Sequence, residues 1–196
     1  MIPRHFQITI ALLLAAILIS GFYIIRLTHK EQAKSLPRME EKLTAPTISA
    51  RPEHIQVLVA YDEDRALRWR EATVTLPNER NLRAREVLRA VLAEYLQHPS
   101  PHPLGKGADI KDVYMINNET VLIDTTAQFA DSHPSGILLE EMTICSLIET
   151  LTANVPGITK IKFVVDGQER DTLAGHVDLM SFYQSSAVHE LAREFQ

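Results

Sequence analysis

Seven side chains in the second half of the chain could act as nucleophiles, acids, bases or metal ligands: Asp131, His133, Ser135, Cys145, Asp166, His176 and Asp178. No catalytic motif connects them. The chain lacks the G-x-S-x-G elbow of serine hydrolases, the H-E-x-x-H helix of zinc proteases and the P-loop. Cys145 lies among apolar residues of an expected helix, where a thiol is buried and inert. We therefore predict no catalytic residues, no cofactor and no enzyme activity.

His176 and Asp178 are the pair whose spacing best fits a metal site. In an extended segment, side chains two residues apart point to the same side. Imidazole nitrogens and carboxylate oxygens both bind zinc, and Asp131 or His133 would add a ligand if the fold brought it near. A loop His and Asp more often bond to backbone groups. Asp131, His176 and Asp178 are therefore candidate ligands only, and we predict no bound metal.

Four small, uncharged polar residues recur on one face of the helix expected after Gly136. They are Thr143, Ser146, Thr150 and Asn154, spaced i, i+3, i+7 and i+11. A solvated helix face usually carries Lys, Arg or Glu, but plain exposure of this face stays open as the alternative. A small, neutral, polar face suits close approach by another surface, in the same domain or in a neighbour. We take these four residues as candidates for an interaction face.

The elements that must position these residues follow from the apolar pattern. Residues 55–61 and 72–76 are β-rich, with a charged hairpin loop between them. Apolar residues spaced i, i+3, i+4, i+7, i+8 and i+11 predict a helix over 84–95, which Asn78 or Asn81 could cap. The first half of the folded unit is therefore a hairpin followed by a helix.

The second half repeats this arrangement. Residues 112–116 and 120–124 flank turn-forming residues and predict a second hairpin. The helix that carries the polar face ends near Asn154, and residues 160–165 form a strand before the turn Asp166-Gly167. A short helix over 187–195 follows. The order β-β-α-β-β-α-β predicts an α+β fold in which two helices pack on a small sheet.

Residues 8–25 are apolar apart from two hydroxyl residues and Tyr23, and a helix of this length spans a bilayer. A cleaved signal peptide is the alternative, but the apolar run is long and no small-x-small cleavage site follows it. The chain therefore divides into a short N-terminal segment (1–5), a transmembrane anchor (6–27), a flexible tether (28–52), a domain (53–180) and a C-terminal extension (181–196).

Charge is distributed unevenly along the chain, whose formal net charge is −5. Residues 1–52 carry +4 and residues 53–196 carry −9, so the domain is a poor nucleic-acid binder and we predict no such partner. The basic residues after the anchor favour an inward C-terminal side, whereas long domains translocate largely regardless of charge. Charge alone therefore leaves the orientation open. The single cysteine excludes an intramolecular disulfide and a multi-cysteine metal site.

Four stretches of residues 112–179 together resemble one family, the sporulation and spore germination (GerMN) domain. They are VYMINNETVLID, FADSHPSG, TICSLIETLTANVPGITKIKFVVDG and TLAGHVDL, and residues 55–96 match the weaker first half of that domain. The family-motif positions are His133, Pro134, Asp166, Gly167, Gly175, His176 and Asp178. The chain departs from the family pattern in having a single copy, a helical anchor and an added segment after Leu179.

The resemblance implies a ring-building-motif-like α+β module displayed outside the cytoplasmic membrane, in which the motif positions set the shape rather than catalyse. It does not imply a role in sporulation. We therefore expect a bacterial single-pass protein of the cytoplasmic membrane whose extracytoplasmic domain forms a homo-oligomer or docks on an envelope protein. Two alternatives stay open: a module that binds glycans or small ligands, and a metal-dependent envelope hydrolase that uses His176, Asp178 and Asp131.

Overall fold

The computed structural model describes residues 50–196. The predicted N-terminal segment (1–5), the anchor (6–27) and the tether (28–52), apart from the last three tether residues, lie outside the described residues. From residue 50 onward, no helix is both long and apolar enough to cross a membrane. The first strand begins at Ala50, three residues before the predicted start of the domain.

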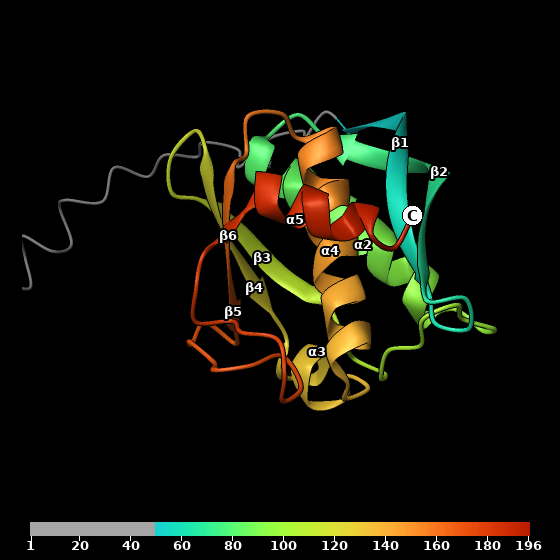
Figure 1. Cartoon of the computed structure of the whole chain (residues 1–196). Coiled ribbons are helices and arrows are strands. Elements are labelled where there is room, and N and C mark those ends of the chain that lie inside the picture. The colour runs from blue at the N-terminus through green and yellow to red at the C-terminus, as the bar shows by residue number, and fades with distance from the viewer. Residues whose placement is uncertain (1–49) are drawn as a thin grey trace, which may run out of the picture. The chain divides into compact units, whose positions relative to one another are not determined.

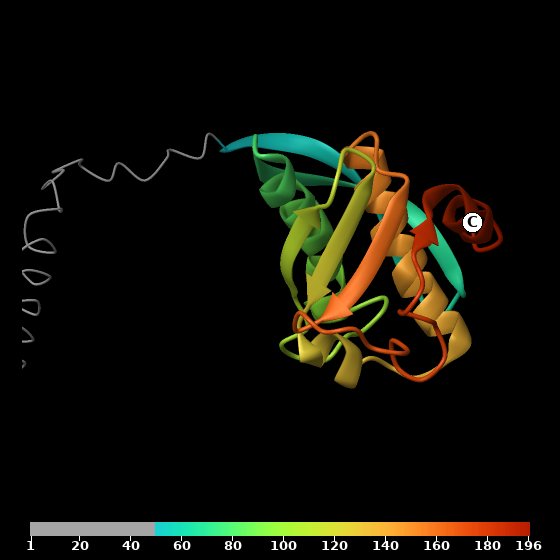
Figure 2. The same ribbon diagram turned by 90° about the vertical axis from the view of Figure 1, so that its left-hand side faces the viewer.

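Figure 1 and Figure 2 show three layers: a two-stranded hairpin, a pair of helices and a four-stranded sheet. The hairpin consists of β1 (Ala50–Tyr61) and β2 (Ala66–Pro77). The helices of the middle layer are α2 (Arg80–Leu96) and α4 (Ile137–Asn154). The sheet consists of β3 (Ile110–Met115), β4 (Thr120–Thr125), β5 (Lys160–Val165) and β6 (Tyr183–Gln184). Buried side chains from all three layers form one core.

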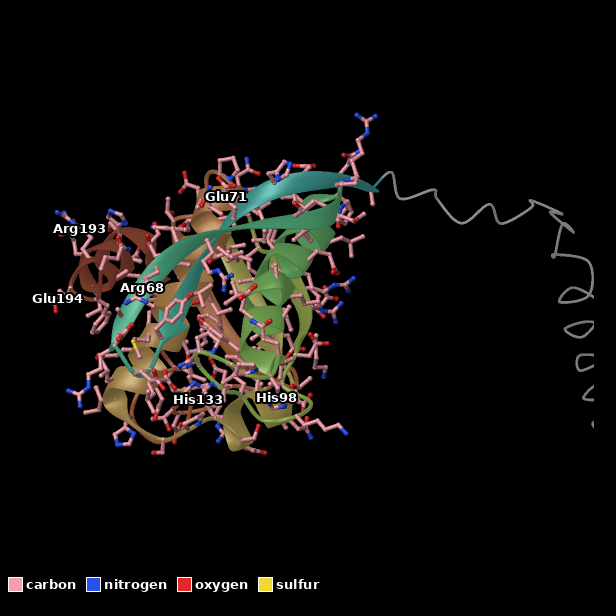
Figure 3. All side chains as sticks on the ribbon, turned by 90° about the vertical axis from the view of Figure 1, so that its right-hand side faces the viewer. Arg68, Glu71, His98, His133, Arg193 and Glu194 are labelled. Carbon is pink, nitrogen blue, oxygen red and sulfur yellow. The ribbon has the colours of Figure 1, made fainter. Side chains whose placement is uncertain are left out.

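The hairpin is longer than the sequence pattern predicts. It pairs without interruption from Ala50 with Pro77 to Tyr61 with Ala66, so the loop is confined to residues 62–65. Charged residues after the turn do not end β2, because Arg68, Arg70 and Glu71 keep their side chains exposed to solvent while the backbone pairs with β1. Figure 3 shows Arg68 and Glu71 on this strand.

The sheet has the order β3-β4-β5-β6. β3 and β4 are antiparallel, and the side chain of Asn117 closes their turn by accepting hydrogen bonds from the backbone N–H groups of Glu119 and Thr120 (2.9 and 2.8 Å). β4 and β5 are parallel, and α4 connects them. Such a crossover lays the connecting helix against one face of the sheet. It therefore places α4 in the centre of the domain.

The predicted apolar stripe of α2 is buried, from Ala84 to Tyr95. The helix begins four residues earlier than predicted, and its cap is neither Asn78 nor Asn81. The Glu79 carboxylate accepts hydrogen bonds from the backbone N–H groups of Asn81 and Leu82 (3.0 and 2.8 Å). A carboxylate here satisfies two free donors and complements the positive end of the helix dipole.

Two short elements are not predicted: β6 and the helix α3 (Ala127–Asp131). The last helix, α5 (Ser185–Arg193), begins two residues before the predicted one and buries Val188 and Ala192 against the core. The α+β class and the order of the five main strands and two main helices are confirmed. The strands form two separate sheets rather than one, because the hairpin lies across the helices from the others.

Candidate functional site

Three of the four residues of the predicted interaction face of α4 are buried inside the domain, and the fourth, Asn154, is half-buried. Ser146 Oγ donates to the carbonyl of Leu58 (2.5 Å), and Thr150 Oγ1 accepts from the N–H of Leu58 (2.8 Å). Oδ1 of Asn154 accepts from the N–H of Gln56 (3.3 Å), and Nδ2 of Asn154 donates to the carbonyl of Gln56 (2.7 Å). Gln56 and Leu58 lie two residues apart on the edge of β1 that does not pair with β2.

These contacts show that the face interacts within its own domain, which is one of the two alternatives that the sequence leaves open. A two-stranded hairpin leaves backbone donors and acceptors unpaired along each outer edge, and burying them without partners is costly. The polar residues of α4 take the place of a third strand beside β1. Thr143, like Ser146 and Thr150, has no exposed surface. These three residues are therefore not available to a neighbouring molecule.

Thr143 belongs to a buried network with two histidines. Its Oγ1 lies 2.6 Å from Nε2 of His102 and 2.7 Å from Nε2 of His133. Nδ1 of His102 donates to Asp62 (2.5 Å), and Nδ1 of His133 donates to the carbonyl of Pro134 (2.7 Å). Both Nδ1 atoms therefore carry protons.

The Thr143 hydroxyl has one proton and three acceptors within reach, because its Oγ1 also lies 3.0 Å from the carbonyl of Leu139. It therefore links the two imidazoles to the backbone of α4. Burial lowers the pKa of His133, which keeps that ring neutral. Asp62, His102 and Thr143 are linked like a catalytic triad, but His102 and Thr143 have no surface that a substrate could reach.

The three candidate metal ligands are bound to separate partners. Asp131 pairs with Arg170 (2.5 Å), His176 pairs with Glu140 (2.9 Å), and Asp178 accepts from the backbone N–H of Met180 (2.7 Å). A hydrogen bond from Ser181 lowers the pKa of Asp178. Across residues 50–196 no three His, Cys, Asp or Glu side chains are grouped as a metal site requires.

Glu140 organises the segment around Gly175 and His176, a role that no sequence motif predicts. It has no exposed surface. Its Oε2 accepts hydrogen bonds from the backbone N–H groups of Ala174, His176 and Val177 (3.0, 3.1 and 2.9 Å). Its Oε1 accepts from Nδ1 of His176 and, across the first turn of α4, from the N–H of Gly136 (2.9 and 3.2 Å).

This arrangement keeps a buried carboxylate ionised. Burial by itself raises the pKa of Glu140, but the hydrogen bonds from Val177, His176, Ala174 and Gly136 outweigh it and bring the pKa to about 2. Oγ of Ser135 lies 3.5 Å from Nδ1 of His176, the nitrogen that already donates a hydrogen bond to Glu140. A relay from a nucleophile through an imidazole needs both ring nitrogens, so Ser135, His176 and Glu140 are not a triad.

The motif positions at the end of β5 form a turn. Asp166 and Gly167 have φ angles of 49° and 74°. Asp166 accepts hydrogen bonds from Lys111 and from the N–H of Ala127 (2.9 and 3.1 Å), and the contact with Lys111 lowers its pKa. The N–H of Gly167 donates to Asp124 (2.8 Å). These residues join β5 to β3, β4 and the start of α3.

An open groove of about 520 Å³ lies between α4, α5 and the segment that leads into β6. Its walls are mostly apolar and include Ile137 and Ile144 from α4, Leu191 from α5, and Phe182. Cys145 also borders the groove, but burial raises the pKa of its thiol to about 12, so it is a protonated, poor nucleophile at neutral pH. The groove can therefore bind apolar groups but offers no activated nucleophile.

The described residues form an α+β domain with buried polar networks and an open apolar groove. Comparison with known families assigns this domain to a family. The family model Germane, described as "Sporulation and spore germination", matches residues 56–171, which is more than half of the chain. The chain therefore belongs to this family and contains a GerMN-type domain, which confirms the resemblance seen in the sequence.

The solved structures that are similar to this chain include the following two. A crystal structure at 2.5 Å described as a "Putative Lipoprotein from Clostridium perfringens" is 19% identical, with a TM-score of 0.46, covering 71% of this chain and 91% of that one. The tandem GerMN domains of the sporulation protein GerM from Bacillus subtilis are 16% identical, with a TM-score of 0.48. That match covers 67% of this chain and 45% of the tandem protein. No curated protein matches the sequence.

Proposed function

We propose that this chain is a non-catalytic docking module of a bacterial cell-envelope assembly. One contrast within residues 50–196 carries the proposal. The reactive side chains are held in contacts inside the domain, whereas an apolar groove between α4 and α5 stays open. Contiguous apolar surface on a folded domain marks an interaction site. The module therefore acts by binding, either to an envelope protein or to a second copy of itself.

Two further observations support a location in the cell envelope. Membership of the sporulation and spore germination family is consistent with an envelope role. The apolar run of residues 8–25 is long enough for a membrane anchor. On this proposal the chain is a single-pass protein of the cytoplasmic membrane, and its C-terminal domain lies on the extracytoplasmic side.

Cross-linking in intact cells and light scattering test the docking role together. The full chain, expressed at its native level, is cross-linked in the membrane and then purified in detergent for size-exclusion chromatography with light scattering. We expect either a defined oligomer or a cross-linked envelope partner. A strict monomer at high concentration, with no cross-linked species in the membrane, would contradict the proposal.

Alkaline phosphatase tests the side of the membrane, because this enzyme folds to its active form only after export. We expect a fusion behind Gln196 to be active. A fusion that is stably expressed yet inactive would place the domain in the cytoplasm and overturn the proposed topology.

A module for glycans or small ligands is the second candidate, and the size of the groove favours it. Ligand pockets are commonly about 300–1,000 Å³, and the groove of about 520 Å³ carries the aromatic rings of Phe182 and Tyr183. A thermal-shift screen of the full chain against cell-wall glycan fragments tests it. A concentration-dependent rise in Tm would favour the ligand module, and no rise with any fragment would remove it.

A further inference from the structure

The groove between α4 and α5 has an acidic edge. Glu141 lines it, is half-buried, and has no salt bridge with any other residue of 50–196. The other two glutamates of α4, Glu140 and Glu149, pair with His176 and His189. The exposed Asp178 lies on the same groove. No Lys or Arg is among the lining residues. A partly desolvated carboxylate without a counter-charge is a favourable site for a cation from outside the domain.

The apolar part of the groove can accommodate apolar side chains of a partner. Ile137 and Phe182 stand at its borders with 59% and 47% of their surfaces exposed, while Ile144 is buried. The ring of Phe182 is held by Lys160, whose Nζ lies 4.5 Å from the ring centroid. Figure 1 shows α5 lying across α4, so the groove has a helix on each of two sides. Grooves of this kind take the apolar face of an amphipathic helix.

We propose that the groove binds a basic amphipathic helix of a different envelope protein. Apolar side chains of that helix, spaced i, i+3 and i+4, fill the space between Ile137, Ile144 and Phe182. A Lys or Arg beside them pairs with Glu141, and Asp178 strengthens the attraction. This inference rests on the proposed docking function and names the site and the chemistry of the partner.

Charge argues against the other occupants. Residues 53–196 carry a net charge of −9, so charge disfavours a second copy of this domain as the occupant of the groove. Bacterial membrane surfaces are anionic, and an acidic groove does not suit them. A basic amphipathic segment of another protein can pack on the apolar walls and pair with the carboxylate of Glu141.

A pair of synthetic peptides tests the proposal. One is a fluorescent amphipathic helix of leucine, alanine and lysine, and the other carries glutamate at every lysine position. Each is titrated against the full chain in nanodiscs of zwitterionic phosphatidylcholine, and anisotropy in empty nanodiscs is subtracted. We expect the lysine peptide to bind and Glu141→Lys to weaken that binding about tenfold or more. The same variant should gain affinity for the glutamate peptide.

Three controls identify the site. Glu119→Lys makes the same change of charge at an exposed turn away from the groove, and we expect it to leave affinity within about twofold. Ala187→Trp fills the groove from an exposed position of α5 and should abolish binding of both peptides. Unchanged thermal unfolding confirms that each variant is folded.

Equal affinity of wild type and Glu141→Lys for the lysine peptide would overturn the inference, as would binding no greater than to empty nanodiscs. Neither result would affect the proposed docking role if cross-linking in cells still yields a partner. Conversely, the expected charge reversal without any cross-linked partner or oligomer would leave the groove assignment intact and contradict the docking role.

Discussion

Nδ1 of His176 donates a hydrogen bond of 2.9 Å to Oε1 of Glu140, a carboxylate without exposed surface. This contact fastens the segment after β5 to the first turn of α4. The same segment continues through Asp178 to Phe182 and forms one wall of the apolar groove. The shape of the groove therefore depends on the buried carboxylate of Glu140.

Replacing Glu140 by Ala should destabilise the domain by about 3 kcal/mol or more. The substitution leaves the backbone N–H groups of Ala174, His176 and Val177 without their acceptor in a buried place. Urea unfolding followed by circular dichroism measures the free energy of unfolding. The matched control is Glu141→Gln on the next residue, which should change it by less than about 0.5 kcal/mol. Equal effects of the two substitutions would show that Glu140 does not hold the segment.

Stability should fall in acid because of the same carboxylate. The pKa of Glu140 is about 2 in the folded domain and 4.5 is its ordinary value, so its ionised form stabilises the fold above about pH 4.5. That contribution, about 3 kcal/mol, is lost as the pH falls from about 4.5 to 2. Urea unfolding of the wild type and of Glu140→Gln across this range measures it. The difference between them should shrink on acidification, and a constant difference would contradict the assignment.

The polar side chains of α4 should stabilise the free edge of β1. Ser146→Ala removes the donor to the carbonyl of Leu58 and the acceptor for the hydroxyl of Tyr95, and we expect a loss of about 1–3 kcal/mol. Thr152→Ala is the control, because the Thr152 hydroxyl bonds only to carbonyls of its own helix. Hydrogen exchange at the amide of Leu58 should accelerate in Thr150→Val but not in Thr152→Ala. Unchanged exchange in Thr150→Val would show that the edge is held by other contacts.

Both buried histidines should carry a proton on Nδ1. Nδ1 of His102 lies 2.5 Å from the Asp62 carboxylate and Nδ1 of His133 lies 2.7 Å from the carbonyl of Pro134, and both partners are acceptors. Long-range nitrogen–proton correlation spectra of the imidazole rings detect this proton. A ring protonated on Nε2 alone would contradict the assignment.

Much of the fold could be predicted from local pattern. The apolar stripe of α2 and the alternation in the strands fix which face of each element is buried, so the α+β class follows from the sequence. The length of β2 could not be predicted, because its charged residues suggest a loop until the exposed side of the hairpin is known. The five-residue helix α3 is too short to show a period.

The candidate site could be predicted less well, because its contacts join distant parts of the chain. The polar face of α4 was identifiable as unusual, but its partner, the edge of β1, lies more than 80 residues away in sequence. Glu140 gives a weak signal: a carboxylate beside Leu139 and near Met142 in a helix otherwise rich in apolar residues. Only the folded chain shows that three backbone N–H groups converge on it.

Photo-cross-linking in living cells tests the docking role of the groove most directly. Ile137 and Ile116 are isoleucines of nearly equal exposure, 59% and 62%, but only Ile137 borders the groove. Each is replaced in turn by p-benzoylphenylalanine in the full chain, and the cells are irradiated. We predict a discrete cross-linked product from position 137 and none from position 116. Products of equal yield from both positions, or none from position 137, would contradict a docking module that binds through the groove between α4 and α5.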